Sequence, residues 1–120
     1  MDARLRGHDE EKEERMFRRK KDRTVTWPVE VYVPVDGGQF ETQTFNARFL
    51  LLEEDPTIAE LGNLDRLSAA VVGWDSVTDD DGSDFAYSPE ARELLLRIGY
   101  VRTALFRAYI EASLGAKRKN

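Results

Sequence analysis

The chain has 120 residues, a length typical of one domain whose core needs no disulfide or metal support. It contains no cysteine, which excludes disulfides, thiolate metal sites and thiol nucleophiles, and no apolar run that predicts a signal peptide or a membrane span. We therefore expect a soluble, cytoplasmic protein. Its formal net charge of -5 is unevenly distributed: residues 15–23 are basic, residues 67–91 carry acidic side chains without lysine or arginine, and residues 117–119 are basic. Such complementary charge can support self-association or binding to another partner.

Residues 1–23 form a charged arm with few apolar side chains. Glutamate and arginine stand four residues apart in Glu11 with Arg15 and in Glu14 with Arg18, and each pair favours a helix by about 0.3 kcal/mol. The arm has no apolar face to bury, so it is a solvated helix, disordered when free, or ordered only on a partner. We expect residues 24–120 to form a single folded domain.

Residues 25–35 alternate with the period of a half-buried strand, and the valines share one face with Trp27. Pro28 and Pro34 lack an amide donor, which predicts an edge strand or a strand broken at those points. Residues 36–38, Asp-Gly-Gly, then predict a tight hairpin turn.

The return strand begins near Gln39, and its apolar side chains also alternate. Phe40 is out of phase, which predicts a bulge or an aromatic side chain that packs on Tyr32 from the solvent side. The remaining apolar positions continue the valine face of the first strand, and they are Phe45, Ala47, Phe49 and Leu51.

Helical spacing runs from Ile58 to Val71, with Asp55 or Thr57 as its start, although residues 71–73 also resemble a short apolar strand. An exposed tryptophan and an Asp-rich loop follow. Residues 88–90, Ser-Pro-Glu, then combine an N-cap, a proline suited to the first turn and an acid at the positive end of a helix. The apolar stripe of this C-terminal stretch consists of Leu94, Ile98, Val101, Leu105, Ala108 and Ala112.

Gly99 either divides this last stretch into two helices or kinks one. Strands come first and helices afterwards, so the predicted fold class is α+β. Its parts are an N-terminal charged arm, a β-hairpin and three helices, with an acidic loop before the C-terminal helical pair.

Catalytic chemistry finds little support in this sequence. The only histidine, His8, lies in the charged arm, where no rigid element holds it for a triad or a metal site. Gly37 and Gly38 lack the lysine and the helix of a phosphate-binding loop. The acids of residues 79–84 lie in a loop that does not fix two carboxylates at the separation that glycoside hydrolysis needs. We predict a non-enzymatic protein with no catalytic residue, no metal and no cofactor.

Four aspartates within residues 79–84 surround Gly82 and suggest a calcium loop. When that glycine is aligned with the invariant loop glycine, the first and twelfth loop positions fall on Val77 and Ser88, so the bidentate glutamate is missing. A solvated Asp/Gly turn fits better. Weak cation binding, and with it a calcium-dependent adaptor, stays open.

Two features suit binding. The basic segment 15–23 contains Phe17, so it can contact phosphates and stack on a base, and a nucleic-acid-associated adaptor is our alternative function. A solvated or protein-docking arm is the simpler interpretation because the chain as a whole is acidic. Trp27 is in register with the valines and is expected in the core, whereas Trp74 suits either the core or an interface.

Several short segments resemble, in their order and spacing, the tail assembly chaperones of long-tailed bacteriophages. They are Phe45–Phe49, Val71–Asp75, Asp79–Gly82, Tyr87–Glu90, Val101–Leu105 and Ala108-Tyr109. The likeness covers about residues 25–120 and leaves the charged arm outside it.

This resemblance implies a small protein of the infected bacterial host cytoplasm that is absent from the mature virion. Its implied partner is the tape-measure protein, a long helical client that it keeps soluble while the tail tube polymerises. The family also implies a longer, frameshifted form that recruits tail-tube protein, and a chain that closes with residues 117–120 resembles the short form.

A chaperone of this kind needs an apolar groove for client helices, a charged exterior, and copies that tile along the client as a homo-oligomer or an open helical array. No membrane partner is expected. We predict client contacts at Trp74, Phe85 and Tyr87. We predict a head-to-tail subunit contact between the basic arm and the acidic loop, through Arg15, Arg18, Arg19, Lys20, Asp79, Asp80 and Asp81.

Overall fold

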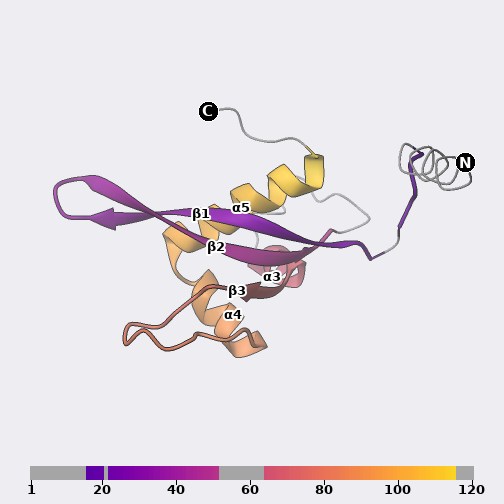
Figure 1. The fold of residues 1–120 in the computed structure, drawn as a ribbon. Helices are drawn as coiled ribbons and strands as arrows, with labels where there is room; N and C mark the ends of the chain where they lie inside the picture. Colours follow the sequence, from indigo (N-terminus) through magenta and orange to yellow (C-terminus); the bar gives the residue numbers. More distant parts are fainter. Residues whose placement is uncertain (1–15, 21, 52–63, 116–120) are drawn as a thin grey trace, which may run out of the picture.

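The structure is a computed structural model that describes residues 16–20, 22–51 and 64–115. Within these ranges the chain forms an antiparallel sheet, whose three strands lie in chain order, and three helices (Figure 1). The predicted α+β class, the β-hairpin and the three helices are confirmed. The predictions for residues 1–15 and 52–63 lie outside the described residues.

The two long strands, β1 (Thr24–Val35) and β2 (Gln39–Leu50), pair in continuous register along their full lengths. In the turn between them Gly37 and Gly38 have φ angles of 85° and 73°, which glycine adopts without strain. β1 lies at the edge of the sheet, as its prolines predicted.

The bulge that was one prediction for Phe40 is wrong, whereas the alternative position on the solvent side is confirmed. Phe40 stands directly opposite Pro34 in the uninterrupted register, and its side chain is 66% exposed. It is out of phase with the buried phenylalanines only because it belongs to the solvent face of the hairpin. The ring of Tyr32 instead contacts the guanidinium of Arg107, whose central carbon lies 5.2 Å from the ring centroid.

The third strand, β3 (Val71–Asp75), pairs antiparallel with β2. The helical spacing that reached Val71 extends one residue too far, because α3 (Leu64–Ala70) ends before it and Val71 pairs with Phe49. Val71 is fully buried, so an apolar residue that fits a helical stripe is used by the sheet. The strand-like reading of residues 71–73 is the correct one.

The C-terminal pair consists of α4 (Pro89–Leu96) and α5 (Gly99–Leu114), so Gly99 divides the stretch into two helices. The Ser88 hydroxyl caps α4 by accepting a hydrogen bond of 3.0 Å from the backbone N–H of Ala91. The guanidinium of Arg102 in α5 donates to the Leu96 carbonyl at 3.0 Å and ties the two helices together.

The predicted apolar stripe holds in α5 but fails in α4. Leu105 in α5 is fully buried, whereas Leu94 in α4 is 55% exposed. The chain leaves helical geometry between Leu96 and Gly99, which resets the phase of the stripe, and α4 buries Leu96 instead.

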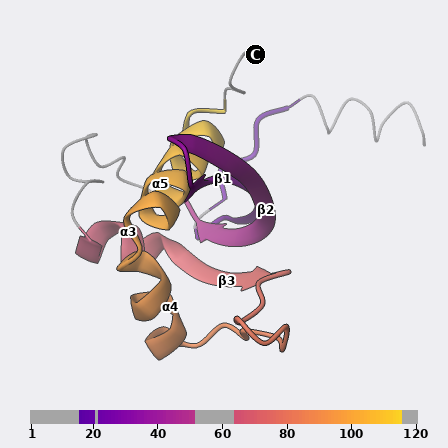
Figure 2. The same cartoon turned by 90° about the vertical axis from the view of Figure 1, so that its left-hand side faces the viewer.

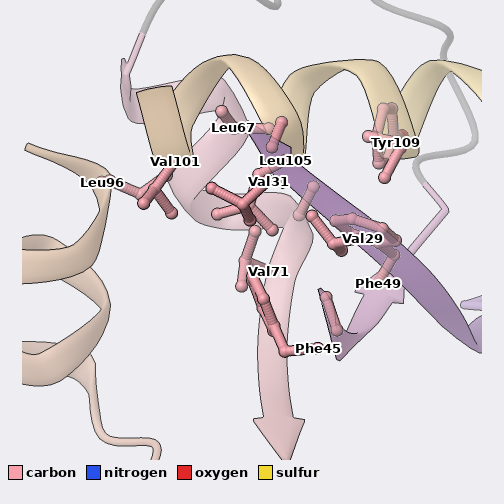
Figure 3. Close-up of a cluster of buried hydrophobic side chains, with 14 residues drawn as sticks. Val29, Val31, Phe45, Phe49, Leu67, Val71, Leu96, Val101, Leu105 and Tyr109 are labelled. Carbon is pink, nitrogen blue, oxygen red and sulfur yellow. The ribbon is translucent and has the colours of Figure 1, made fainter. Parts of the chain in front are cut away.

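The core lies between the sheet and α5, and Figure 2 shows β1 and β2 curving around that helix. Within this core, Phe49 and Tyr109 lie with ring centroids 5.5 Å apart and an interplanar angle of 82°, a favourable edge-to-face pair. Trp27 packs against this core, as predicted. None of the helices in the described ranges has the length and hydrophobicity needed to cross a lipid bilayer. Figure 3 shows the largest side chains of the hydrophobic core, which are Val29, Val31, Phe45, Phe49, Leu67, Val71, Leu96, Val101, Leu105 and Tyr109.

Candidate functional site: an apolar groove with an acidic rim

The Asp-rich segment after β3 folds back on itself as a short hairpin, which we call the acidic hairpin (residues 76–85). The backbone N–H of Phe85 donates to the Val77 carbonyl at 2.8 Å, and that of Asp79 donates to the Ser83 carbonyl at the same distance. Gly82 closes the turn with a φ of 86°. These backbone hydrogen bonds fix the position of the aspartates relative to the sheet.

Two aspartate carboxylates of the acidic hairpin accept hydrogen bonds from other groups of the same hairpin. The Asp81 carboxylate accepts hydrogen bonds from the Ser83 hydroxyl at 2.6 Å and the Ser83 N–H at 3.0 Å. These bonds favour the charged carboxylate and lower the pKa of Asp81 below its ordinary value. The Asp79 carboxylate accepts from the N–H of Asp80 at 3.0 Å. This geometry is that of an Asp/Gly turn, and no three acidic or histidine side chains converge on a metal position in the part of the chain that the structure describes.

Trp74, Phe85 and Tyr87, the three predicted client contacts, lie together as an aromatic cluster. The Trp74 and Phe85 rings are stacked with centroids 6.0 Å apart, and the Trp74 and Tyr87 rings meet edge to face at 5.0 Å. The Trp74 indole N–H donates to the Phe85 carbonyl at 2.8 Å, and the Tyr87 hydroxyl donates to the Val71 carbonyl at 3.1 Å. All three side chains are half-buried. The cluster therefore joins the acidic hairpin and the start of α4 to β3.

Beside this cluster lies a groove of about 460 Å³. It is lined by the half of the β1–β2 hairpin nearer its turn, by the acidic hairpin and by the α4–α5 junction. Val31 and Phe45 contribute core side chains to its floor. Asp79 and Asp80 form one rim, and exposed Ile98 and Tyr100 form part of the other. The groove thus has a mixed lining of apolar and uncharged polar side chains, with negative charge at Asp79 and Asp80. Its remaining lining residues are Val33, Gln43, Thr44, Ser76, Val77, Thr78, Phe85, Leu95 and Val101.

The structure divides the predicted client contacts. Phe85 lines the groove, whereas Trp74 and Tyr87 do not. Trp74 stacks on the Phe85 ring, and Tyr87 in turn contacts Trp74. Sequence reasoning missed Ile98 and Tyr100 as groove residues. The signal for them was an apolar and an aromatic residue on either side of the glycine at which a new helix begins.

The predicted subunit contacts lie on opposite sides of the molecule. The first described part of the basic segment, residues 16–20, includes Arg18, Arg19 and Lys20, all of them exposed. Figure 1 shows it leaving the body beyond the start of β1, at the end of the long axis away from the acidic hairpin. Arg15 lies outside the described residues. The described parts of the two predicted surfaces therefore do not meet within one chain.

Every fully buried side chain in the described ranges is hydrophobic, so none of them is a carboxylate or imidazole held in a dry cavity. Comparisons with known protein families, with curated proteins and with solved structures found no match.

Proposed function

We propose that this protein is a tail assembly chaperone that binds the tape-measure protein of a long-tailed bacteriophage and keeps it soluble in the host cytoplasm while the tail tube polymerises. The observation that carries the proposal is the groove of about 460 Å³, which opens an apolar floor to solvent beside Asp79 and Asp80. An amphipathic helix presents the matching chemistry: an apolar stripe for the floor and flanking lysine or arginine for the rim.

The size of the groove supports a stoichiometry of many copies to one client. A volume of about 460 Å³ accommodates only a few side chains, whereas a tape-measure helix presents apolar residues along its whole length. Many copies must therefore tile along one client, with self-association between neighbours. The high surface charge of each copy keeps such an assembly soluble. A longer, frameshifted form would bring tail-tube protein to the same assembly.

Co-expression with the tape-measure protein encoded by the same phage tests this function. The readout is the fraction of tape-measure protein that stays soluble, and we expect it to rise with this chain and to remain low without it. A tape-measure protein whose solubility is unchanged by the wild-type chain overturns the proposal.

Ile98→Asp is the informative variant. Ile98 precedes α5 as its N-cap and has no side-chain capping bond, so aspartate there suits the helix while it places a charge in the groove. We expect this variant to fold and to lose the solubilising effect. Leu94→Asp is the matched control, because Leu94 is exposed and does not line the groove. Equal loss in both variants would place client binding elsewhere.

A further inference from the structure

The basic segment carries two apolar side chains that nothing in the described structure covers. Phe17 is 89% exposed and Met16 is 64% exposed, and three basic residues follow them directly. Exposed phenylalanine is costly to leave in water, by about 1.5–3 kcal/mol relative to its burial. Adjacent exposed apolar residues beside concentrated charge are typical of an anchor for another surface.

The groove has the complementary chemistry. Its lining includes apolar side chains among polar ones, it is open to solvent, and Asp79 and Asp80 are accessible to the basic side chains that follow Phe17. We infer that Met16 and Phe17 of one copy dock in the groove of a second copy, with Arg18 and Lys20 against the acidic rim.

The position of the segment favours a contact between copies. The Arg23 carbonyl accepts a hydrogen bond of 2.8 Å from the N–H of Leu51, and the Arg23 guanidinium donates to the Arg18 carbonyl at 3.0 Å. These bonds tie the segment to the end of the sheet that lies away from the acidic hairpin (Figure 1). A donor surface at one end and an acceptor surface at the other make a heterologous, head-to-tail contact, which extends into an open array unless its rotation closes.

This contact is a form of self-association without client, distinct from the contact between neighbours on a client, and it rests on the proposed function only because both use the same groove. It also gives the groove a cover in the absence of a client, because a client helix must displace Met16 and Phe17 of the neighbouring copy. Purified protein without any client tests the contact, so its failure leaves the chaperone assay above unaffected.

The experiment is sedimentation velocity on the full chain over a range of concentrations at low and high salt. The wild type is expected to associate with increasing concentration, and less strongly at high salt because the charge pairs are exposed. Phe17→Ser and Ile98→Asp are each expected to weaken association roughly tenfold or more. Phe40→Ser is the matched control: it removes another exposed phenylalanine that does not line the groove, and it should leave association unchanged.

Mixing the two defective variants distinguishes this contact from other modes of association. A Phe17→Ser chain keeps its groove and an Ile98→Asp chain keeps its Phe17, so an equimolar mixture should form dimers that grow no further. The inference is overturned by a wild type that stays monomeric, by a Phe17→Ser variant that associates normally, or by a mixture that forms no dimer. A wild type that stays monomeric while its Phe17 binds a single-stranded oligonucleotide would assign the segment to nucleic acid instead.

Discussion

The indole nitrogen of Trp74 donates a hydrogen bond of 2.8 Å to the backbone carbonyl of Phe85, and the rings of the two residues lie almost parallel, with an interplanar angle of 5°. This pair joins the last part of β3 to the end of the acidic hairpin, eleven residues further along the chain. The acidic rim of the groove therefore depends on a tryptophan that does not itself line the groove.

Replacement of Trp74 by phenylalanine tests this relationship. It keeps an aromatic ring but removes the N–H donor, and the Phe85 carbonyl loses its partner in a half-buried place. We expect the free energy of unfolding to fall by about 1–2 kcal/mol. Urea unfolding followed by circular dichroism measures the change.

Trp27→Phe is the matched control for that measurement. The Trp27 N–H donates to the Glu111 carboxylate over a longer distance of 3.3 Å, and this acceptor is a side chain that can reach water instead. We expect a smaller loss of stability. A Trp74→Phe variant as stable as the wild type would show that the hydrogen bond does not hold the acidic hairpin.

The N-cap of α4 offers a second test. The Ser88 hydroxyl accepts from the Ala91 N–H, which otherwise has no partner in the first turn of the helix. Ser88→Ala should therefore lower the free energy of unfolding by about 1 kcal/mol, and Ser88→Asp should retain most of the stability. Thermal and urea unfolding of the three proteins would show the order. If alanine matches aspartate, the cap contributes nothing measurable.

The reset of the helical stripe between α4 and α5 predicts unequal losses of stability when two leucines are truncated. Leu105→Ala removes a fully buried side chain from the centre of the core and should cost about 2–5 kcal/mol. Leu94→Ala makes the same chemical change at an exposed site and should change stability by less than about 0.5 kcal/mol. A large loss at Leu94 in the protein without client would contradict the packing described above.

Much of this fold is predictable from local sequence. The alternation around Val29 and Val31, the glycines after Asp36, and the capping sequence at Ser88 each act over a few residues, so the strands, the turn and α4 follow from short-range rules. The predicted helical stripes were wrong at two residues that lie near the end of an element. Val71 and Leu94 both fit a continuous helical spacing, and each lies beside a boundary that the spacing alone does not reveal.

The groove could not be predicted in the same way. Its floor and rims come from three stretches, residues 31–45, 76–85 and 95–101, that only tertiary packing brings together. The aromatic residues that sequence reasoning selected did converge, but two of the three stabilise the groove rather than line it. A tryptophan beside an acidic loop indicates a contact without saying whether the contact is internal or external.

The Asp81 carboxylate provides the last prediction, which concerns pH. Hydrogen bonds from the Ser83 hydroxyl and N–H lower the pKa of Asp81 in the folded protein. A carboxyl group whose pKa is lower in the folded than in the unfolded state stabilises the fold above its unfolded pKa, and this contribution disappears as the pH falls through the folded pKa. Ser83→Ala removes the hydroxyl donor, so the pKa of Asp81 should rise toward its ordinary value. The remaining backbone N–H should keep it slightly low.

Carboxyl-carbon NMR titration of the wild type and of Ser83→Ala measures this shift directly. Ser83→Thr retains a hydroxyl and should restore most of the lowered pKa, which separates the loss of the donor from a general loosening of the acidic hairpin. An unchanged pKa in Ser83→Ala would mean that the 2.6 Å hydrogen bond does not persist in solution. The Ser83 N–H would then be the remaining donor to the Asp81 carboxylate, and the backbone bond from the Asp79 N–H to the Ser83 carbonyl would still close the turn.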